Sequence, residues 1–96
     1  MGIAEHFFTS GADADFQSLF ERYGDPFYRV VDLAIEQLRE HPESGPVYDG
    51  PVRRLVMRGT PLGLFYGLHG RRLAIIAILD LRQDPQVIAR RIGQWE

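Results

Sequence analysis

The spacing of apolar residues predicts helices in the first half of the chain. After a weakly alternating opening, Gly2–Phe8, apolar residues recur at intervals of three and four positions through residues 16–23 and 27–38. This is the period of a helix with one apolar face. Gly24 ends the first helix, and Asp25-Pro26 supplies a capping side chain and a first-turn proline for the second. These signals predict a short strand followed by a helical hairpin.

The period changes to two after residues 41–51, a connector with three prolines and two glycines. Val52–Arg58 and Leu62–His69 alternate between two faces, as strands do. Arg72–Leu81 is apolar on both faces, which predicts a central strand, and Asp84-Pro85 begins a short final helix. The order β-α-α-β-β-β(-α) predicts an α+β fold in which the helical hairpin packs on one face of a four-stranded, mostly antiparallel sheet.

Composition is that of an ordinary globular protein. The 96 residues, 45% hydrophobic and 25% charged, predict a single domain over residues 1–96. The longest strongly apolar run, Leu73–Leu79, is too short to cross a bilayer, and the first ten residues lack the basic region of a signal peptide. There is no cysteine, which excludes disulfides and thiolate chemistry. We therefore expect a cytoplasmic protein without a membrane partner.

Charge is divided unevenly along the chain. Residues 1–50 hold three arginines and ten acidic residues, whereas residues 51–96 hold eight arginines and three acidic residues. The two halves can therefore offer surfaces of opposite sign to two partners. If Arg54, Arg58 and Arg82 share the open sheet face, they can grip phosphates or an acidic protein surface. The alternative is ordinary solvent-facing charge.

The sequence contains no recognisable catalytic or metal-binding constellation. His6, His41 and His69 lack the spacing of metal motifs, and no GxSxG or phosphate-binding loop occurs. Asp13 and Asp84 stand where helix N-terminal capping accounts for them. We therefore expect no catalytic residue, no metal and no cofactor.

Residues 52–85 resemble the C-terminal sheet of the ParE/RelE toxin superfamily. Family members show a Val-Arg-Arg-Leu-like strand, an aromatic strand, an aliphatic strand and an Arg-x-Asp-Pro-like ending. Here these elements are Val52-Arg53-Arg54-Leu55, Phe65-Tyr66, Ile75–Leu79 and Arg82-Gln83-Asp84-Pro85. With the preceding helical hairpin, the resemblance covers nearly the whole chain. It implies a small toxin of a type II toxin–antitoxin system, silenced by a cognate antitoxin.

The superfamily has two main branches. RelE-like toxins cut messenger RNA in the ribosomal A site with basic residues on the sheet and a Tyr or His of the last helix, whereas ParE-like toxins block DNA gyrase. Arg54 matches one interferase position, but Val56, Gly63 and Ala89 occupy the others. Those three residues supply no acid, base or cation for cleavage, and a pI near 5.9 is poor for docking on ribosomal RNA.

The resemblance therefore predicts a ParE-like toxin that inhibits DNA gyrase by protein binding. Two alternatives stay open. The first is a RelE-like, ribosome-dependent endoribonuclease that uses Arg54, Arg58, Arg82 and His69. The second is a degenerate, non-toxic relative that acts as a binding module. The expected partners are a cognate antitoxin and gyrase, with no direct sequence-specific binding of nucleic acid.

Candidate binding residues fall into two groups of opposite charge. Family antitoxins lay a helix along the toxin's helical hairpin and add an extended segment at the sheet. The acidic Glu21, Asp32 and Glu36 of the hairpin would attract a basic antitoxin helix. Trp95 is expected to be either a contact residue or part of the core. The residues expected to bind the target or an acidic antitoxin segment are Arg53, Arg54, Arg58, Tyr66 and Arg82.

Overall fold

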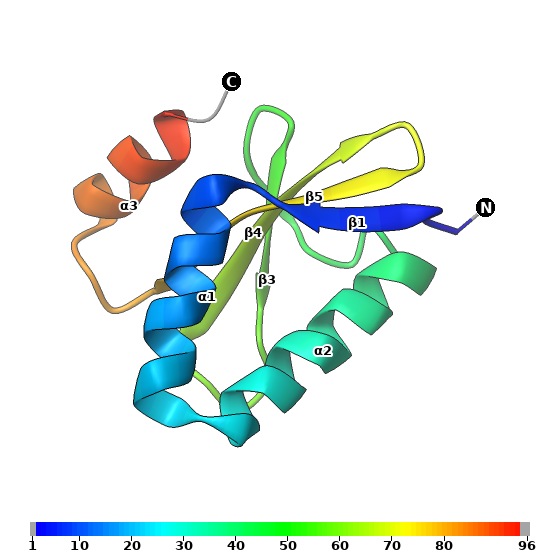
Figure 1. Cartoon of the computed structure of the whole chain (residues 1–96). Coiled ribbons are helices and arrows are strands. Elements are labelled where there is room, and N and C mark those ends of the chain that lie inside the picture. Colours follow the sequence, from blue (N-terminus) through cyan, green and yellow to red (C-terminus); the bar gives the residue numbers. More distant parts are fainter. Residues whose placement is uncertain (1, 95–96) are drawn as a thin grey trace.

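The computed structural model describes residues 2–94, in which five strands form one sheet (Figure 1). In chain order the elements are β1 (Glu5–Phe8), α1 (Ser10–Tyr23), α2 (Asp25–Glu40), β2 (Val47–Asp49), β3 (Val52–Val56), β4 (Leu62–His69), β5 (Arg72–Asp80) and α3 (Pro85–Gly93). The sheet order is β1-β5-β4-β3-β2, with β1 parallel to β5 and the other neighbours antiparallel. The predicted α+β architecture is confirmed.

The helical hairpin has the capping signals that its sequence predicts. Thr9 caps α1, because its hydroxyl oxygen accepts a hydrogen bond from the Ala12 amide at 3.2 Å. Gly24 takes a φ of 71° between the two helices, a conformation that glycine adopts at little cost. Pro26 stands in the first turn of α2, where its missing N–H is not needed.

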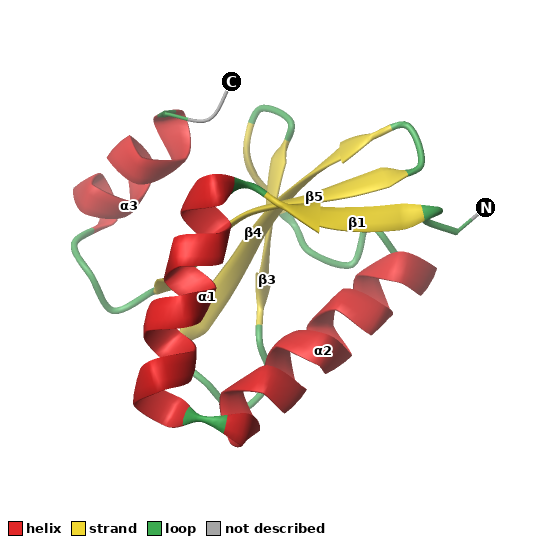
Figure 2. Ribbon diagram, viewed as in Figure 1, coloured by secondary structure: helices red, strands yellow, loops and turns green. Residues whose placement is uncertain are grey.

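Apolar side chains cover both faces of the sheet. On one face, α1 and α2 pack over alternate residues of β4 such as Leu64 and Tyr66. On the other face, Ile88 and Ile92 of α3 pack over Phe65. Figure 2 shows α1 and α2 in front of the strands and α3 apart from α2. The predicted alternation of β4 is confirmed, and α3 covers part of the second face.

β5 lies between β1 and β4, as its apolar character on both faces predicts. Tyr66 of β4 pairs with Ile75, and Phe65 pairs with Ala77, so Ile76 is an extra residue in β5. The bulge turns Ile75 toward the core under α1 and α2, and Ile76 and Ala77 toward the core under α3. One strand thereby contributes to both cores.

The sheet has one strand that was not predicted, and some strand ends differ from the sequence prediction, since β1 begins at Glu5 and β5 ends at Asp80. The connector contains the strand β2, where Val47 pairs with Arg53, so the sheet has five strands instead of four. A three-residue strand among prolines and glycines is too short to show a period of two. The strand β3 ends at Val56, so Arg58 lies in the following turn and not on the strand.

Three further expectations concern Trp95, membrane spans and metal binding. Trp95 lies outside the described residues. Within residues 2–94, no helix is long and apolar enough to span a membrane. Over the same range, no three potential ligands gather into a metal site.

Candidate protein-binding groove

The arginines predicted to share one sheet face lie on different sides of the molecule. Arg54 is opposite Phe65 in the β3–β4 ladder, so it lies on the face that α3 partly covers. Arg58 belongs to the β3–β4 turn and Arg82 to the loop before α3, and both line a hollow beside α2. The prediction that the three arginines share one sheet face is therefore wrong, because β3 ends before Arg58 and the chain turns away from the sheet there.

Arg54 lies against an aromatic side chain. Its guanidinium carbon is 5.8 Å from the centre of the Tyr48 ring, which is within cation–π range. Its Nε is buried and has no hydrogen-bond partner among residues 2–94. The Tyr48 ring packs edge-on against Phe65 at 5.1 Å. The neighbouring positions on this face, Val56 and Gly63, pair with each other across the ladder. Neither can donate or accept a proton.

Tyr66 and Arg53 hold the loop that precedes β2. The Tyr66 hydroxyl donates to the Pro42 carbonyl at 2.7 Å and accepts from the Gly45 amide at 3.0 Å. Arg53 Nη1 donates to the Gly45 carbonyl at 2.8 Å. Tyr66 is fully buried, and this burial raises its pKa above the ordinary value. Tyr66 therefore offers no surface to a partner, which corrects its predicted place among the binding residues.

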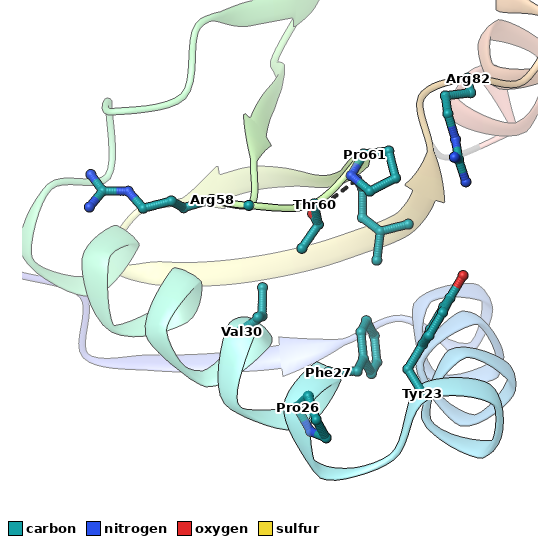
Figure 3. Close-up of a pocket in the computed structure, with 10 residues that line it drawn as sticks. Tyr23, Pro26, Phe27, Val30, Arg58, Thr60, Pro61 and Arg82 are labelled. Carbon is teal, nitrogen blue, oxygen red and sulfur yellow. Dashed lines mark hydrogen bonds between the residues drawn. The ribbon is translucent and has the colours of Figure 1, made fainter.

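A hollow of about 490 Å³ opens between the α1–α2 turn and the β3–β4 turn, and we call it the turn hollow. Phe27 and Leu62, 4% and 5% exposed, are the most buried residues that line it. Tyr23 and Arg82 stand on one side and Arg58 on the other (Figure 3). The size and the apolar lining are those of ligand pockets in general.

The walls of the turn hollow are two constrained turns. Gly59 has a φ of 78°, a conformation that favours glycine. The Thr60 hydroxyl oxygen accepts from the Leu62 amide at 3.0 Å, drawn as a dashed line in Figure 3. Pro26 and Pro61 fix φ on the two sides. The hollow is therefore largely formed before any partner arrives.

A second hollow of about 480 Å³ continues the first along α2. The two share Val30 and Arg58, and the second adds the exposed side chains of Leu33 and Val56. Strand β2 pairs with Val52 and Arg53, and the Arg54 amide donates to the Pro46 carbonyl at 3.0 Å. Within residues 2–94, no strand lies beside the rest of that edge. The two hollows form one groove between α2 and β3, which we call the α2–β3 groove.

Positive charge surrounds the turn hollow. Asp80 accepts from Nε and Nη2 of Arg82 at 3.0 Å and 2.7 Å, and chiefly these hydrogen bonds lower the pKa of Asp80 to about 2. The charge of Arg22 lowers the same pKa further, and its guanidinium carbon is 5.6 Å from the centre of the Tyr23 ring. Arg58 and Arg82 line the hollow itself, and the charge of Arg22 acts on Asp80 beside Arg82.

The acidic residues predicted on α2, Asp32 and Glu36, lie away from the α2–β3 groove. Asp32 and Glu36 are one turn apart on α2, on one helix face, and line a hollow with His6 of β1. Glu21 is exposed near the end of α1. The molecule therefore has an acidic face on one side of α2 and a groove bordered by arginine on the other.

The apolar lining of the groove is the part of the site that sequence reasoning missed. Tyr23, Phe27 and Val30 belong to the predicted apolar stripes of the two helices, and stripes of this kind are ordinary core positions. The glycines and prolines of the two turns indicate where the chain turns, but not that the two turns enclose a space.

The similarity of this chain to known proteins is clearer in its fold than in its sequence. No protein-family model matches the chain, and no curated protein matches it. Among solved structures, a chain of the chromosomal ParDE TA system from P. aeruginosa matches with a TM-score of 0.60 and 18% identity, over 82% of this chain and 96% of that one. The chain thus has the fold of a chain from a ParDE system, in agreement with its sequence resemblance to ParE/RelE toxins.

Proposed function

We propose that this chain is a ParE-like toxin of a toxin–antitoxin pair, which acts in the cytoplasm by binding DNA gyrase and is neutralised by its antitoxin. The observation that carries the proposal is the fold match to a chain of a ParDE TA system over 82% of this chain. The Arg-rich second half of the sequence, with its Arg-x-Asp-Pro ending, adds to it.

The surroundings of Arg54 support binding over cleavage. Hydrolysis of RNA through the 2′-hydroxyl needs a base, an acid and cationic stabilisation within hydrogen-bond reach. Arg54 supplies a cation, but Val56 and Gly63 stand beside it on the sheet, and Ala89 is exposed on α3. A protein with this face can hold a target without cutting it.

The antitoxin is proposed to occupy two surfaces of opposite charge. An extended acidic segment fits the α2–β3 groove, because within residues 2–94 no strand lies beside the outer edge of β3 after Arg54, and Arg58 borders the groove. A basic helix fits the face of α2 that carries Asp32 and Glu36. Arg53 and Arg54 lie on β3 near the same edge.

Expression of this chain alone is expected to arrest growth, and co-expression of a second gene that encodes its cognate antitoxin is expected to restore it. The physical reason is that an unoccupied binding surface captures the target, and the antitoxin covers that surface by mass action. Growth curves after induction, with and without the second gene, measure both effects.

The matched control for growth arrest is Phe65→Asp, which places a charge in the core under α3 and should abolish folding and arrest together. Normal growth while the folded wild-type chain accumulates would contradict the toxin assignment. That result would leave the degenerate binding module as the better account.

A further inference from the structure

The turn hollow is constrained on both sides, and this favours a ligand that fits it as it stands. The φ values of Gly24 and Gly59 are 71° and 78°, and each of these glycines is followed within two residues by a proline. Because the walls are rigid, binding does not include the free-energy cost of ordering a flexible site. The ligand shape is therefore set by the space between Tyr23 and Pro61.

The interior of the hollow selects an apolar group. Phe27 and Leu62 are almost fully buried, and Val30 and Pro61 add aliphatic surface. Tyr23 is 46% exposed, so an apolar side chain inserted here would remove a large aromatic surface from water. One leucine, methionine or phenylalanine side chain is the kind of group that this space accepts.

The rim selects negative charge next to that apolar group. Asp80 engages Nε and Nη2 of Arg82, which leaves Nη1 available to a second carboxylate. Arg58 stands on the other side of the hollow and is exposed. A cationic ligand would meet the like charges of Arg58 and Arg82.

We propose that the turn hollow is the anchor site for the antitoxin's acidic segment. One large apolar side chain of that segment enters between Tyr23 and Pro61, and carboxylates on either side of it pair with Arg58 and Arg82. That the segment belongs to an antitoxin rests on the proposed function. That the hollow prefers an acidic segment with an apolar side chain does not.

The test is titration of the ¹⁵N-labelled chain with two capped peptides, observed by NMR. The acidic peptide is Glu-Asp-Leu-Phe-Asp-Glu and the charge-reversed peptide is Lys-Arg-Leu-Phe-Arg-Lys. The acidic peptide should shift the amides of Phe27, Thr60 and Leu62, and the basic peptide should bind at least about tenfold more weakly. Equal shifts with both peptides, or shifts confined to the acidic face of α2, would overturn the proposal.

Variants separate the anchor site from general attraction between charges. Arg58→Glu should weaken binding of the acidic peptide at least about tenfold, while Arg90→Glu, an exposed residue of α3, should change it less than about twofold. Val30→Phe should fill the hollow and abolish the shifts. If that variant fails to fold by circular dichroism, Arg58→Glu against Arg90→Glu still decides the outcome.

Two other outcomes of these experiments would also decide the proposal. Shifts of the same amides on dilution, without peptide, would show that a second copy of the chain occupies the hollow, and would overturn the proposal. Absence of peptide binding while growth arrest and rescue persist would overturn the anchor site and leave the toxin assignment standing. Peptide binding without growth arrest would support the anchor site and overturn the toxin assignment.

Discussion

Replacing Asp15 with alanine is expected to lower the free energy of unfolding by about 2–4 kcal/mol. Asp15 accepts from Arg91 Nη1 at 3.0 Å and Nη2 at 2.7 Å, and from the Ile78 amide at 3.0 Å. This one side chain of α1 therefore ties α3 to the edge of β5, beyond the end of β1. Its loss would leave a half-buried guanidinium and a backbone amide without their partner.

The size of this effect follows from how far water reaches the ion pair. The side chains of Asp15 and Arg91 are 14% and 32% exposed, so the pair is screened less than a surface pair but more than a fully buried one. Urea denaturation followed by circular dichroism measures the loss. Asp13→Ala is the matched control, because Asp13 is exposed in the first turn of the same helix. A loss at Asp15 no larger than at Asp13 would contradict the role of the pair.

Replacing Tyr66 with phenylalanine is expected to cost about 1–3 kcal/mol of stability, because the Pro42 carbonyl and the Gly45 amide lose their shared partner. Tyr28→Phe, at a ring that is 52% exposed, should change stability little. Thermal or urea unfolding of the two variants makes the comparison. Equal stabilities would mean that the loop before β2 is not held by the Tyr66 hydroxyl.

The Tyr66 hydroxyl also makes the stability of the protein depend on pH in alkaline solution. Burial raises its pKa in the folded state, so the unfolded chain releases this proton first as the pH rises past about 10. The stabilisation is complete below that pH and is lost as the pH climbs toward the folded-state pKa. Stability should therefore fall less steeply above pH 10 in Tyr66→Phe than in the wild-type chain.

Elements with long, regular apolar patterns could be predicted from the sequence. The stripe of α2, the alternation of β4 and the two-faced apolar run of β5 each reflect the packing of one element against a complete layer. The strand β2 could not be predicted in this way. It has three residues, its pairing is irregular between Val47 and Asp49, and its position depends on the loop that Tyr66 and Arg53 hold.

The site was harder to predict than the fold, because it depends on where strands end. Alternation along residues 52–58 would place Arg54 and Arg58 on one face, but β3 stops at Val56 and the turn carries Arg58 toward α2. Tyr66 belongs to an aromatic pair in a strand, and only the bonds to the 42–45 loop show that its hydroxyl is structural. The turn hollow arises between segments distant in sequence, which no local pattern encodes.

What the sequence and the structure agree on is the chemistry around Arg54. The resemblance to RelE-like toxins aligns Val56 and Gly63 with interferase positions, and the structure pairs them beside Arg54 on one sheet face. Neither Val56 nor Gly63 can move a proton, and the ring beside Arg54 is that of Tyr48. The central claim of the proposed function is that the chain acts by holding a protein target.

Supercoiling of relaxed plasmid by DNA gyrase, with the purified chain at micromolar concentration, tests this claim most directly. The account predicts that supercoiling stops or that gyrase cleavage complexes accumulate, and that ribosomes translating a message in the presence of the chain leave that message uncut. Unimpaired supercoiling together with cuts at the ribosomal A site, mapped by primer extension, would contradict it.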